Sequence, residues 1–239
     1  MENDTLLHVI NRLTNAQIHT SPYPYFYIDN IFPDDFYQEL LANLPDTSSY
    51  QGLSQTGKVD QRTYLDRFVL PLEEDQLNQL SFSQFLFWSN FNIAIKSDEW
   101  CSALLKKFDC HIKERFGIYY EKVKFSSTAE LVRDRTNYSI GPHTDHPVRV
   151  LTLLFYFPSS NDQSHLGTSI YEPLDPTFEC EGFTHHPFNG FKNLYTAPFS
   201  PNSVFGFVKS NSSFHGREPI LDKGIERNLM NYYLQWNHK

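Results

Sequence analysis

The sequence predicts an α+β fold in which a mainly antiparallel β core has helices packed on one side. Apolar residues recur at helical spacing in much of the first 120 residues, whereas period-two alternation predominates from Tyr119 onward. The composition points the same way, because Tyr and Phe favour half-buried sheet surfaces and the chain holds 14 Tyr and 21 Phe against 10 Gly. Helices followed by strands are typical of a sheet core with helices packed against it.

Helices and one short strand are predicted in the first half. Residues 4–18 place apolar side chains at helical spacing, and residues 25–28 form a short strand. Pro33 suits the first turn of a second helix, and the two acids after it complement the positive helix end. A third helix begins at an N-cap, Ser97, and runs to about residue 116, before a glycine. Residues 46–80 are polar and irregular.

The second half contains a series of candidate strands separated by Gly, Pro, Asn and Ser clusters. They cover residues 122–126, 128–134, 149–157, 168–171, 203–208 and 227–236. No linker-like stretch interrupts the chain, and 239 residues suit one domain. We therefore expect a single domain over 1–239, with helical support and the first strands in 1–120 and a catalytic β core in 121–239.

Charge and apolar patterning disfavour several classes of protein. The 28 acidic and 20 basic side chains give a net charge of −8, which argues against a nucleic-acid binder. No polybasic run suggests membrane docking, and the longest apolar stretch, residues 150–157, is too short for a membrane span. Three cysteines make no disulfide framework, and the N-terminus lacks the pattern of a secretory signal. These features predict a cytoplasmic protein with neither a nucleic acid nor a membrane as partner.

A candidate metal site begins in the segment Gly141-Pro142-His143-Thr144-Asp145-His146. His143 and Asp145 are two residues apart, so on a strand both side chains leave the same face, with Cα atoms roughly 6.5–7 Å apart. An imidazole and a carboxylate placed in this way can share one metal ion. The pair alone is weak evidence, because this spacing also occurs by chance.

A third candidate ligand strengthens the metal interpretation. His215 follows the strand-like residues 203–208, and two histidines with one carboxylate form a facial triad that leaves three positions of an octahedral iron(II) open. Arg227 then opens the last strand. Alternation along that strand places on one face Arg227, Leu229, Asn231 and Tyr233. A guanidinium facing a polar lumen can hold a carboxylate through two hydrogen bonds.

At these residues the chain resembles the iron(II)- and 2-oxoglutarate-dependent oxygenases, in the branch related to prolyl 4-hydroxylases. The resemblance covers roughly residues 22–45 and 121–236. It rests on Pro24–Pro33, His143-Thr144-Asp145 with the hydrophobic strand after it, Gly167–Tyr171, Pro201–Val204, Phe214-His215-Gly216 and the strand that begins at Arg227. The ordered combination is much more specific than any one of these motifs.

The resemblance implies a double-stranded β-helix, which is a jelly-roll of two sheets with the metal near its open mouth. His143, Asp145 and His215 are implied as the ligands of Fe(2+), and Arg227 as the partner of the distal carboxylate of 2-oxoglutarate. A tyrosine on the strand after the first two ligands often helps to hold that carboxylate. Alternation puts Thr152 and Tyr156 on one side of this strand, so both are candidate co-substrate contacts, although a core tyrosine is an equally simple interpretation.

Other polar residues compete for roles at the mouth. Arg217 and Lys223 also follow His215, but Arg217 is expected to meet substrate or solvent and Lys223 lies in a turn. His146 is expected at the rim. The adjacent histidines 185–186 should point apart, which disfavours a second metal site. Weaker substrate candidates precede the triad or follow it, and ordinary packing or strand-edge roles explain them as well: Arg133, Arg135, Asn137, Tyr138 and Arg217.

Residues 172–200 have few strand signals and many Pro, Phe and His, so we expect a long loop that covers the substrate. The family chemistry implies a dioxygenase that uses O2 and 2-oxoglutarate, releases succinate and CO2, and hydroxylates a small molecule, a glycan or a peptide. A non-enzymatic, cupin-like jelly-roll that binds a metal or a sugar is the competing class.

Overall fold

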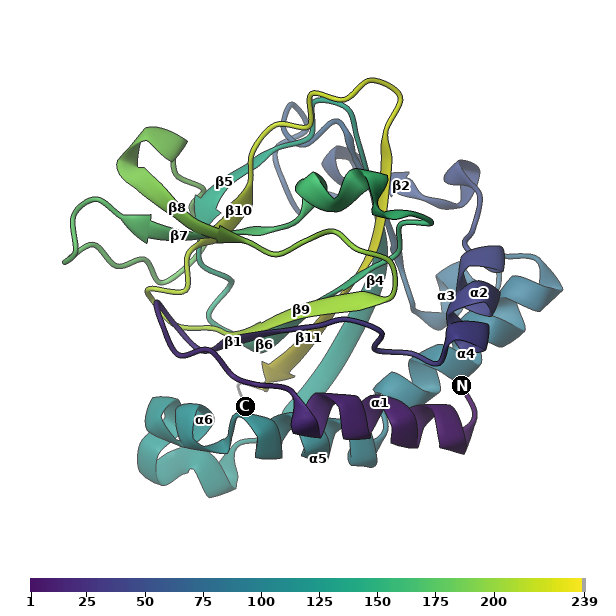
Figure 1. Ribbon diagram of the computed structural model, residues 1–239, viewed down its shortest axis with the longest axis horizontal. Helices are drawn as coiled ribbons and strands as arrows, with labels where there is room; N and C mark the ends of the chain where they lie inside the picture. The colour runs from purple at the N-terminus through teal and green to yellow at the C-terminus, as the bar shows by residue number, and fades with distance from the viewer. Residues whose placement is uncertain (238–239) are drawn as a thin grey trace.

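Two antiparallel sheets form the β core (Figure 1). The computed structural model describes residues 1–237. The larger sheet has the strand order β1-β9-β6-β11-β4-β3-β2, and the smaller has the order β5-β10-β7-β8. The strands of the larger sheet are β1 (Tyr25–Ile28), β9 (Ser203–Val208), β6 (Arg149–Tyr156), β11 (Glu226–Trp236), β4 (Phe125–Arg135), β3 (Arg67–Pro71) and β2 (Gln51–Gly52). Those of the smaller are β5 (Ile140–His143), β10 (His215–Arg217), β7 (Ser169–Pro173) and β8 (Phe191–Thr196).

Helices cover the outer face of the larger sheet, as Figure 1 shows below and beside the strands. They are α1 (Asn3–Asn15), α2 (Asp34–Ala42), α3 (Glu74–Leu77), α4 (Phe82–Ile95), α5 (Asp98–Lys107) and α6 (Asp109–Phe116). Short 3-10 turns lie at Thr47–Ser49, Leu53–Gln55, Gly117–Lys122, Asn161–Leu166 and Phe188–Gly190. Trp88 of α4 and Trp100 of α5 pack in one apolar cluster with Phe155 of β6, so the helices and the sheet share a core.

The last strand divides the molecule into an apolar layer and a polar interior. On one face of β11, Met230, Tyr232 and Leu234 join the core under the helices. On the other face, Arg227 and Asn231 line a cavity between the sheets. The alternation predicted for this strand is therefore confirmed. Burial of the apolar face fixes the register, because a slip of one residue would expose it and bury the polar face.

The predicted fold class is confirmed, and most of the predicted strands are present. Residues 122–126 and 128–134 were expected as two strands, but β4 runs unbroken through Phe125–Arg135 and pairs with β11 along its whole length. The short strands β2, β3, β5, β8 and β10 were not predicted. Each of these five strands has two to six residues, so only a few alternating positions mark it in the sequence.

The helices differ from the expectation at three points, of which the first is the short helix α3, in a stretch that was expected to be irregular. Helix α4 was missed, because its buried and exposed faces both carry apolar residues and no helical period is visible. The helix expected to run from Ser97 to residue 116 breaks in two at Phe108, whose buried ring stacks on Phe26 with centroids 5.7 Å apart. Cys101 and Cys110 therefore lie in different helices, and both are free.

No helix in residues 1–237 combines the length and the apolar character that a membrane crossing requires.

Candidate metal and co-substrate site

His143 and His215 lie directly opposite each other on paired strands. β5 and β10 run antiparallel with these two residues in register, and their ring centroids are 4.3 Å apart. The Nδ1 of His143 is 2.9 Å from the carbonyl oxygen of Gly141, and the Nδ1 of His215 is 3.0 Å from that of Ser213. Because a carbonyl oxygen only accepts, each neutral ring carries its proton on Nδ1 and leaves the Nε2 lone pair free.

Asp145 completes the group from just beyond the end of β5. The spacing argument assumed that both His143 and Asp145 lie on one strand, but β5 ends at His143. Its Oδ1 lies 3.8 Å from the Nε2 of His215. One ligand atom from each of His143, Asp145 and His215 lies within 4.8 Å of the other two, and all three residues are buried. The structure therefore brings together the three residues that the sequence predicted as ligands.

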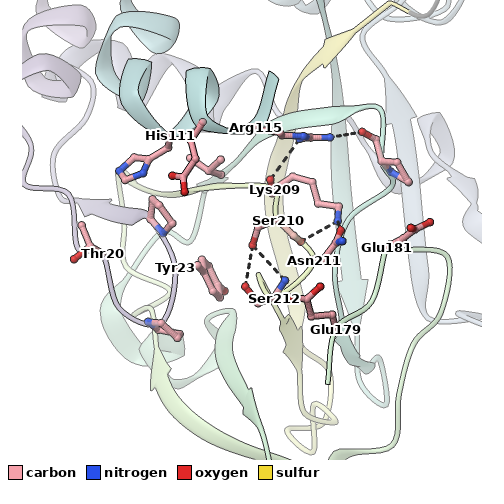
Figure 2. Close-up of a pocket in the computed structure, with 15 residues that line it drawn as sticks. Thr20, Tyr23, His111, Arg115, Glu179, Glu181, Lys209, Ser210, Asn211 and Ser212 are labelled. Carbon is pink, nitrogen blue, oxygen red and sulfur yellow. Dashed lines mark hydrogen bonds between the residues drawn. The ribbon is translucent and has the colours of Figure 1, made fainter. Parts of the chain in front are cut away.

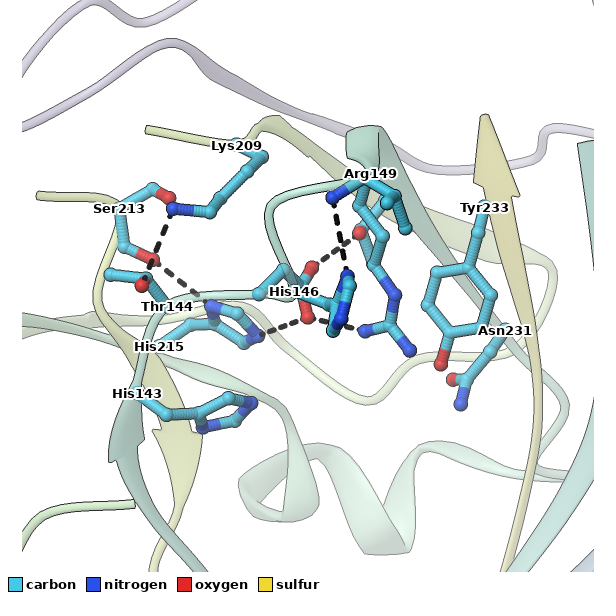
Figure 3. Close-up of polar contacts among 12 residues, drawn as sticks. His143, Thr144, His146, Arg149, Lys209, Ser213, His215, Asn231 and Tyr233 are labelled. Carbon is cyan, nitrogen blue, oxygen red and sulfur yellow. Dashed lines mark hydrogen bonds and ion pairs between the residues drawn. The ribbon is translucent and has the colours of Figure 1, made fainter. Parts of the chain in front are cut away.

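Two neighbours hold the Asp145 carboxylate in place. The hydroxyl of Thr152 donates to one carboxylate oxygen, and the guanidinium of Arg149 donates to the other. Arg149 in turn lies over the ring of Tyr233, with its Cζ 3.6 Å from the centroid (Figure 3). Burial alone would raise the pKa of Asp145, but the charge of Arg149, helped by the hydrogen bond from Thr152, outweighs it and holds this pKa below its usual value. The carboxylate is therefore ionised.

The donor set fits a divalent transition metal. Burial lowers the pKa of both histidines, and at His143 the neighbouring His215 lowers it further. Both rings are therefore neutral, the form that binds a metal. Two imidazole nitrogens and one carboxylate oxygen suit iron(II) and leave positions open for other ligands. The carbonyl partners on Nδ1 and the donors on Asp145 fix the orientation of these side chains, as outer partners do in metal centres.

Arg227 lies buried at one end of the same cavity. Its Nε donates to the carbonyl of Leu166 at 2.6 Å, and one terminal nitrogen lies 2.8 Å from the carboxylate of Asp134. Asp134 also receives two hydrogen bonds from Arg67. Two guanidinium groups thus share one carboxylate, and the three charges sum to +1. This excess positive charge suits an incoming carboxylate.

Tyr156 and Thr168 lie beside Arg227. The second terminal nitrogen of Arg227 is 3.4 Å from the hydroxyl of Thr168, and the backbone N–H of Thr168 donates to the hydroxyl oxygen of Tyr156 at 3.2 Å. Burial raises the pKa of Tyr156, so its hydroxyl stays protonated and can donate. Arg227 and Thr168 line this end of the cavity, and Tyr156 lies behind Thr168, outside the cavity lining.

A cavity of about 870 Å³ joins the ligand group to Arg227. This volume is in the range of pockets that hold a small ligand. Three polar atoms on its wall are buried without a partner in residues 1–237, namely the Tyr138 hydroxyl, the Arg217 Nε and the Asn231 Oδ1. Buried polar atoms are normally hydrogen-bonded, so these three are available to a polar ligand.

Comparison with known proteins identifies the fold. No protein-family model and no curated protein matches the sequence. Among solved structures, the non-haem α-ketoglutarate-dependent carbocyclase SnoK of nogalamycin biosynthesis aligns with a TM-score of 0.52 and 6% identity, over 98% of this chain and 84% of that one. The chain has the fold of the 2-oxoglutarate oxygenases. The predicted double-stranded β-helix is therefore confirmed.

Two further solved structures align at lower scores. A prolyl-4-hydroxylase from Pseudomonas putida has a TM-score of 0.48 and 10% identity, over 98% of this chain and 100% of that one. A 2OG-Fe(II) oxygenase-family oxidoreductase from Burkholderia pseudomallei has a TM-score of 0.49 and 10% identity, over 98% of this chain and 91% of that one.

In this oxygenase fold, the predicted co-substrate contacts separate into two groups. Arg227 and Tyr156 lie together, as described above. Thr152 was predicted to contact the co-substrate, but its hydroxyl donates to Asp145 because β6 passes directly behind the ligand group. Arg217 also lines the cavity and places one terminal nitrogen 3.4 Å from Glu218, whereas Lys223 is exposed.

The weaker substrate candidates lie in different places. Tyr138 is buried in the cavity wall under Arg67, whose Cζ is 4.1 Å from the Tyr138 ring centroid. Arg133 faces away from the cavity: it bonds Asn228 at 2.8 Å and the carbonyl of Pro45, because β4 turns this side chain to the outer face. The prediction that Arg133 lines the mouth is therefore wrong.

Two more of these candidates lie outside the wall of the cavity. Asn137 is exposed in the turn between β4 and β5, with φ of 75°, and its backbone N–H donates to Ile220. Arg135 pairs with Glu226 at 3.4 Å at the protein surface. Neither Asn137 nor Arg135 lines the cavity, so neither contributes to its mouth.

Sequence reasoning missed two residues beside the ligands. Arg149 reads as an ordinary charge at a strand start, and its contact with Asp145 was not anticipated. His185 and His186 do point apart, as predicted. However, the His185 ring lies in the cavity with its centroid 4.5 Å from that of His143, whereas His186 packs among the rings of Phe178 and Phe191. The closeness of His185 to His143 depends on the path of the chain after β7, which no local sequence pattern indicates.

A second pocket, shown in Figure 2, is lined by Arg115 and Lys209, which contact the segment that carries the ligands. The Lys209 ammonium, whose pKa burial lowers to about 8, sits 3.4 Å from the hydroxyl of Thr144 and donates to the Ser210 carbonyl at 2.8 Å. Thr144 stands between His143 and Asp145. Arg115 bonds the backbone carbonyls of Arg149 and Pro147. These groups support the loop that carries Asp145.

The long loop expected over residues 172–200 is interrupted by a strand. Residues 172–200 were expected as one loop, but Phe191–Thr196 form β8, which pairs with β7. Residues 174–187, between β7 and the 3-10 turn at Phe188–Gly190, are named the lid here. It crosses β5 at Gly141, where a Cβ atom would collide with the carbonyl oxygen of His186. Phe183 and His185 of the lid reach the cavity, and Phe183 lies edge-on to His146 at the rim.

We expect amide hydrogens of the lid to exchange faster than those of β6 in the free protein, and to slow when substrate binds. Few lid amides have backbone partners, among them Cys180 to Asn211 and His186 to Pro142. Segments with few such bonds open at low free-energy cost. Hydrogen exchange followed by mass spectrometry measures this on the slow timescale. Protection of residues 181–185 equal to that of β6 would contradict a mobile lid.

Proposed function

We propose that this protein is an iron(II)- and 2-oxoglutarate-dependent dioxygenase that hydroxylates a small-molecule, glycan or peptide substrate. The observation that carries the proposal is the convergence of two Nε2 atoms and one carboxylate in a cavity that also contains a buried arginine. SnoK, which has the same fold, is described as α-ketoglutarate-dependent. The chain acts as a single catalytic unit, with the ligand group between its two sheets.

Each side chain at the site has a specific task in this proposal. His143, Asp145 and His215 hold the metal, and Thr152 with Arg149 fix the Asp145 carboxylate. Arg227 binds the distal carboxylate of 2-oxoglutarate through its guanidinium, with Tyr156 donating beside it. The lid excludes water from the mouth. When bound, iron(II) with 2-oxoglutarate and O2 supplies the oxidising chemistry and gives succinate and CO2 as co-products.

A spectroscopic titration tests this function against a metal-binding jelly-roll without activity. Iron(II) and 2-oxoglutarate added without oxygen should produce a weak visible charge-transfer band, and admission of O2 should produce succinate. A cupin-like binding module would take up the metal but show no band that depends on 2-oxoglutarate. Metal uptake without the band or succinate would therefore favour the binding module.

A further inference from the structure

A polar cluster on the inner face of the larger sheet has no task in the chemistry described above. It consists of Glu130 on β4 with Asn231 and Tyr233 on β11, and Asn231 lies directly across from Glu130. The side-chain amide of Asn231 lies 3.2 Å from Oε1 of Glu130, and the Tyr233 hydroxyl lies 3.4 Å from the same atom. All three side chains line the cavity.

The Asn231 amide has a defined orientation with an unused acceptor. An ionised carboxylate only accepts hydrogen bonds, so Glu130 must face the NH2 group of Asn231. The Oδ1 atom therefore points elsewhere, and it is buried with no partner in residues 1–237. Asn231 as a whole is 4% exposed, so solvent does not satisfy this atom. A ligand that donates a hydrogen bond would satisfy it.

Glu130 is a cavity carboxylate whose only ion pair in residues 1–237 is with an exposed lysine, although Arg149 also acts on it electrostatically. Asp145 is paired with Arg149, and Glu73 at the rim is paired with Lys96 at 3.3 Å. Oε1 of Glu130 has only neutral partners. Its Oε2 lies 3.6 Å from the ammonium of Lys58, whose side chain is 59% exposed. An exposed pair of this kind contributes little, but it shows that an ammonium group fits at this carboxylate.

The cluster lies close enough to the ligand group for one small molecule to reach both. Tyr233 lies opposite Thr152 on the neighbouring strand, and the Thr152 hydroxyl donates to Asp145. The Tyr233 ring packs under Arg149. Strands β4 and β6 flank β11, so Glu130 is two strand spacings, roughly 10 Å, from the strand behind Asp145. A flexible chain of a few carbon atoms spans such a distance.

We propose that Glu130 and Asn231 form a subsite for a protonated amine of the substrate, so that the substrate class is a small primary ammonium compound with a short flexible stem. Glu130 binds the cationic charge and the Asn231 Oδ1 accepts one N–H hydrogen bond. Lys58 is a competing internal cation. That the bound amine is oxidised rests on the proposed function, whereas amine binding itself does not.

Binding of n-pentylammonium, compared with 1-pentanol and pentanoate, tests the subsite. Ligand-observed NMR would measure dissociation constants for protein loaded with iron(II) and 2-oxoglutarate without oxygen, and again for metal-free protein. We expect the cation to bind more tightly than its neutral and anionic analogues in both states. Because the metal-free state needs no oxygenase chemistry, failure of the proposed function would leave this result unaffected.

Variants separate the subsite from a general charge effect. Glu130→Gln should weaken n-pentylammonium binding about tenfold or more, since it removes one member of a partly buried charge pair. Lys58→Ala should tighten binding about two- to fivefold, because it removes the competing cation. Glu73→Gln is the matched control, because Glu73 is a carboxylate at the rim of the same cavity. This change should alter binding less than twofold. Any one of three results would overturn the proposal. These are binding of 1-pentanol as tight as that of n-pentylammonium, unchanged n-pentylammonium binding in Glu130→Gln, and weaker n-pentylammonium binding in Lys58→Ala.

Discussion

His215→Ala abolishes succinate formation and lowers iron(II) affinity more than about a hundredfold, if the proposed ligand set is right. Loss of an outer partner of a metal ligand already lowers affinity about 10–100-fold, and loss of a ligand itself should exceed that. His215 provides one of only two imidazoles in the group and leaves its Nε2 free for the metal. Iron content after gel filtration and equilibrium competition with a chelator measure the loss.

His185→Ala is the matched control for this experiment. His185 lies as close to His143 as His215 does, with centroid separations of 4.5 Å and 4.3 Å, and it also lines the cavity. It is nevertheless not part of the group whose ligand atoms converge. We expect His185→Ala to keep full iron content. Circular dichroism should show the same fold for both variants. Full iron occupancy in His215→Ala, or loss of iron in His185→Ala, would refute the assignment of the ligands.

The second large effect is expected at Arg227. Arg227→Lys should raise the 2-oxoglutarate concentration needed for half-saturation at least about a hundredfold while iron binding survives. Lysine keeps the charge near Asp134 but loses the planar fork that binds a carboxylate through two hydrogen bonds. Breaking a buried pair of this kind costs about 3–5 kcal/mol, which corresponds to such a loss of affinity. Titration of the charge-transfer band with 2-oxoglutarate measures the change.

Arg217→Lys and Lys223→Ala are the comparisons for Arg227→Lys. Arg217 lines the same cavity and its Nε has no partner among residues 1–237, so it is a real structural rival, whereas Lys223 is exposed. We expect both variants to need nearly the same 2-oxoglutarate concentration as the original protein. The Arg67–Asp134 pair should help to preserve the fold in Arg227→Lys. A steep rise in Arg217→Lys alone would move the carboxylate anchor to Arg217.

The sequence by itself determined which residue types can do chemistry and which face they share. His143, Asp145 and His215 stand out because imidazoles and a carboxylate flank strand-like segments, and Arg227 because a guanidinium alternates with apolar residues. These are local signals, since side chains alternate with a period of two along a strand. The structure places all four in one cavity. Signals of this kind can be recognised in the sequence without knowledge of which strands pair.

Only the tertiary structure decided how strands far apart in the sequence combine. The Glu130–Asn231 contact joins residues 101 positions apart, and the Arg227–Asp134 pair joins residues 93 positions apart. The approach of His185 to His143 depends on where the lid crosses β5. Such contacts follow from strand register, and register is set by burying the apolar face of the whole sheet against the helices. That burial is a property of many residues together, so no local pattern shows which partner a polar side chain will meet.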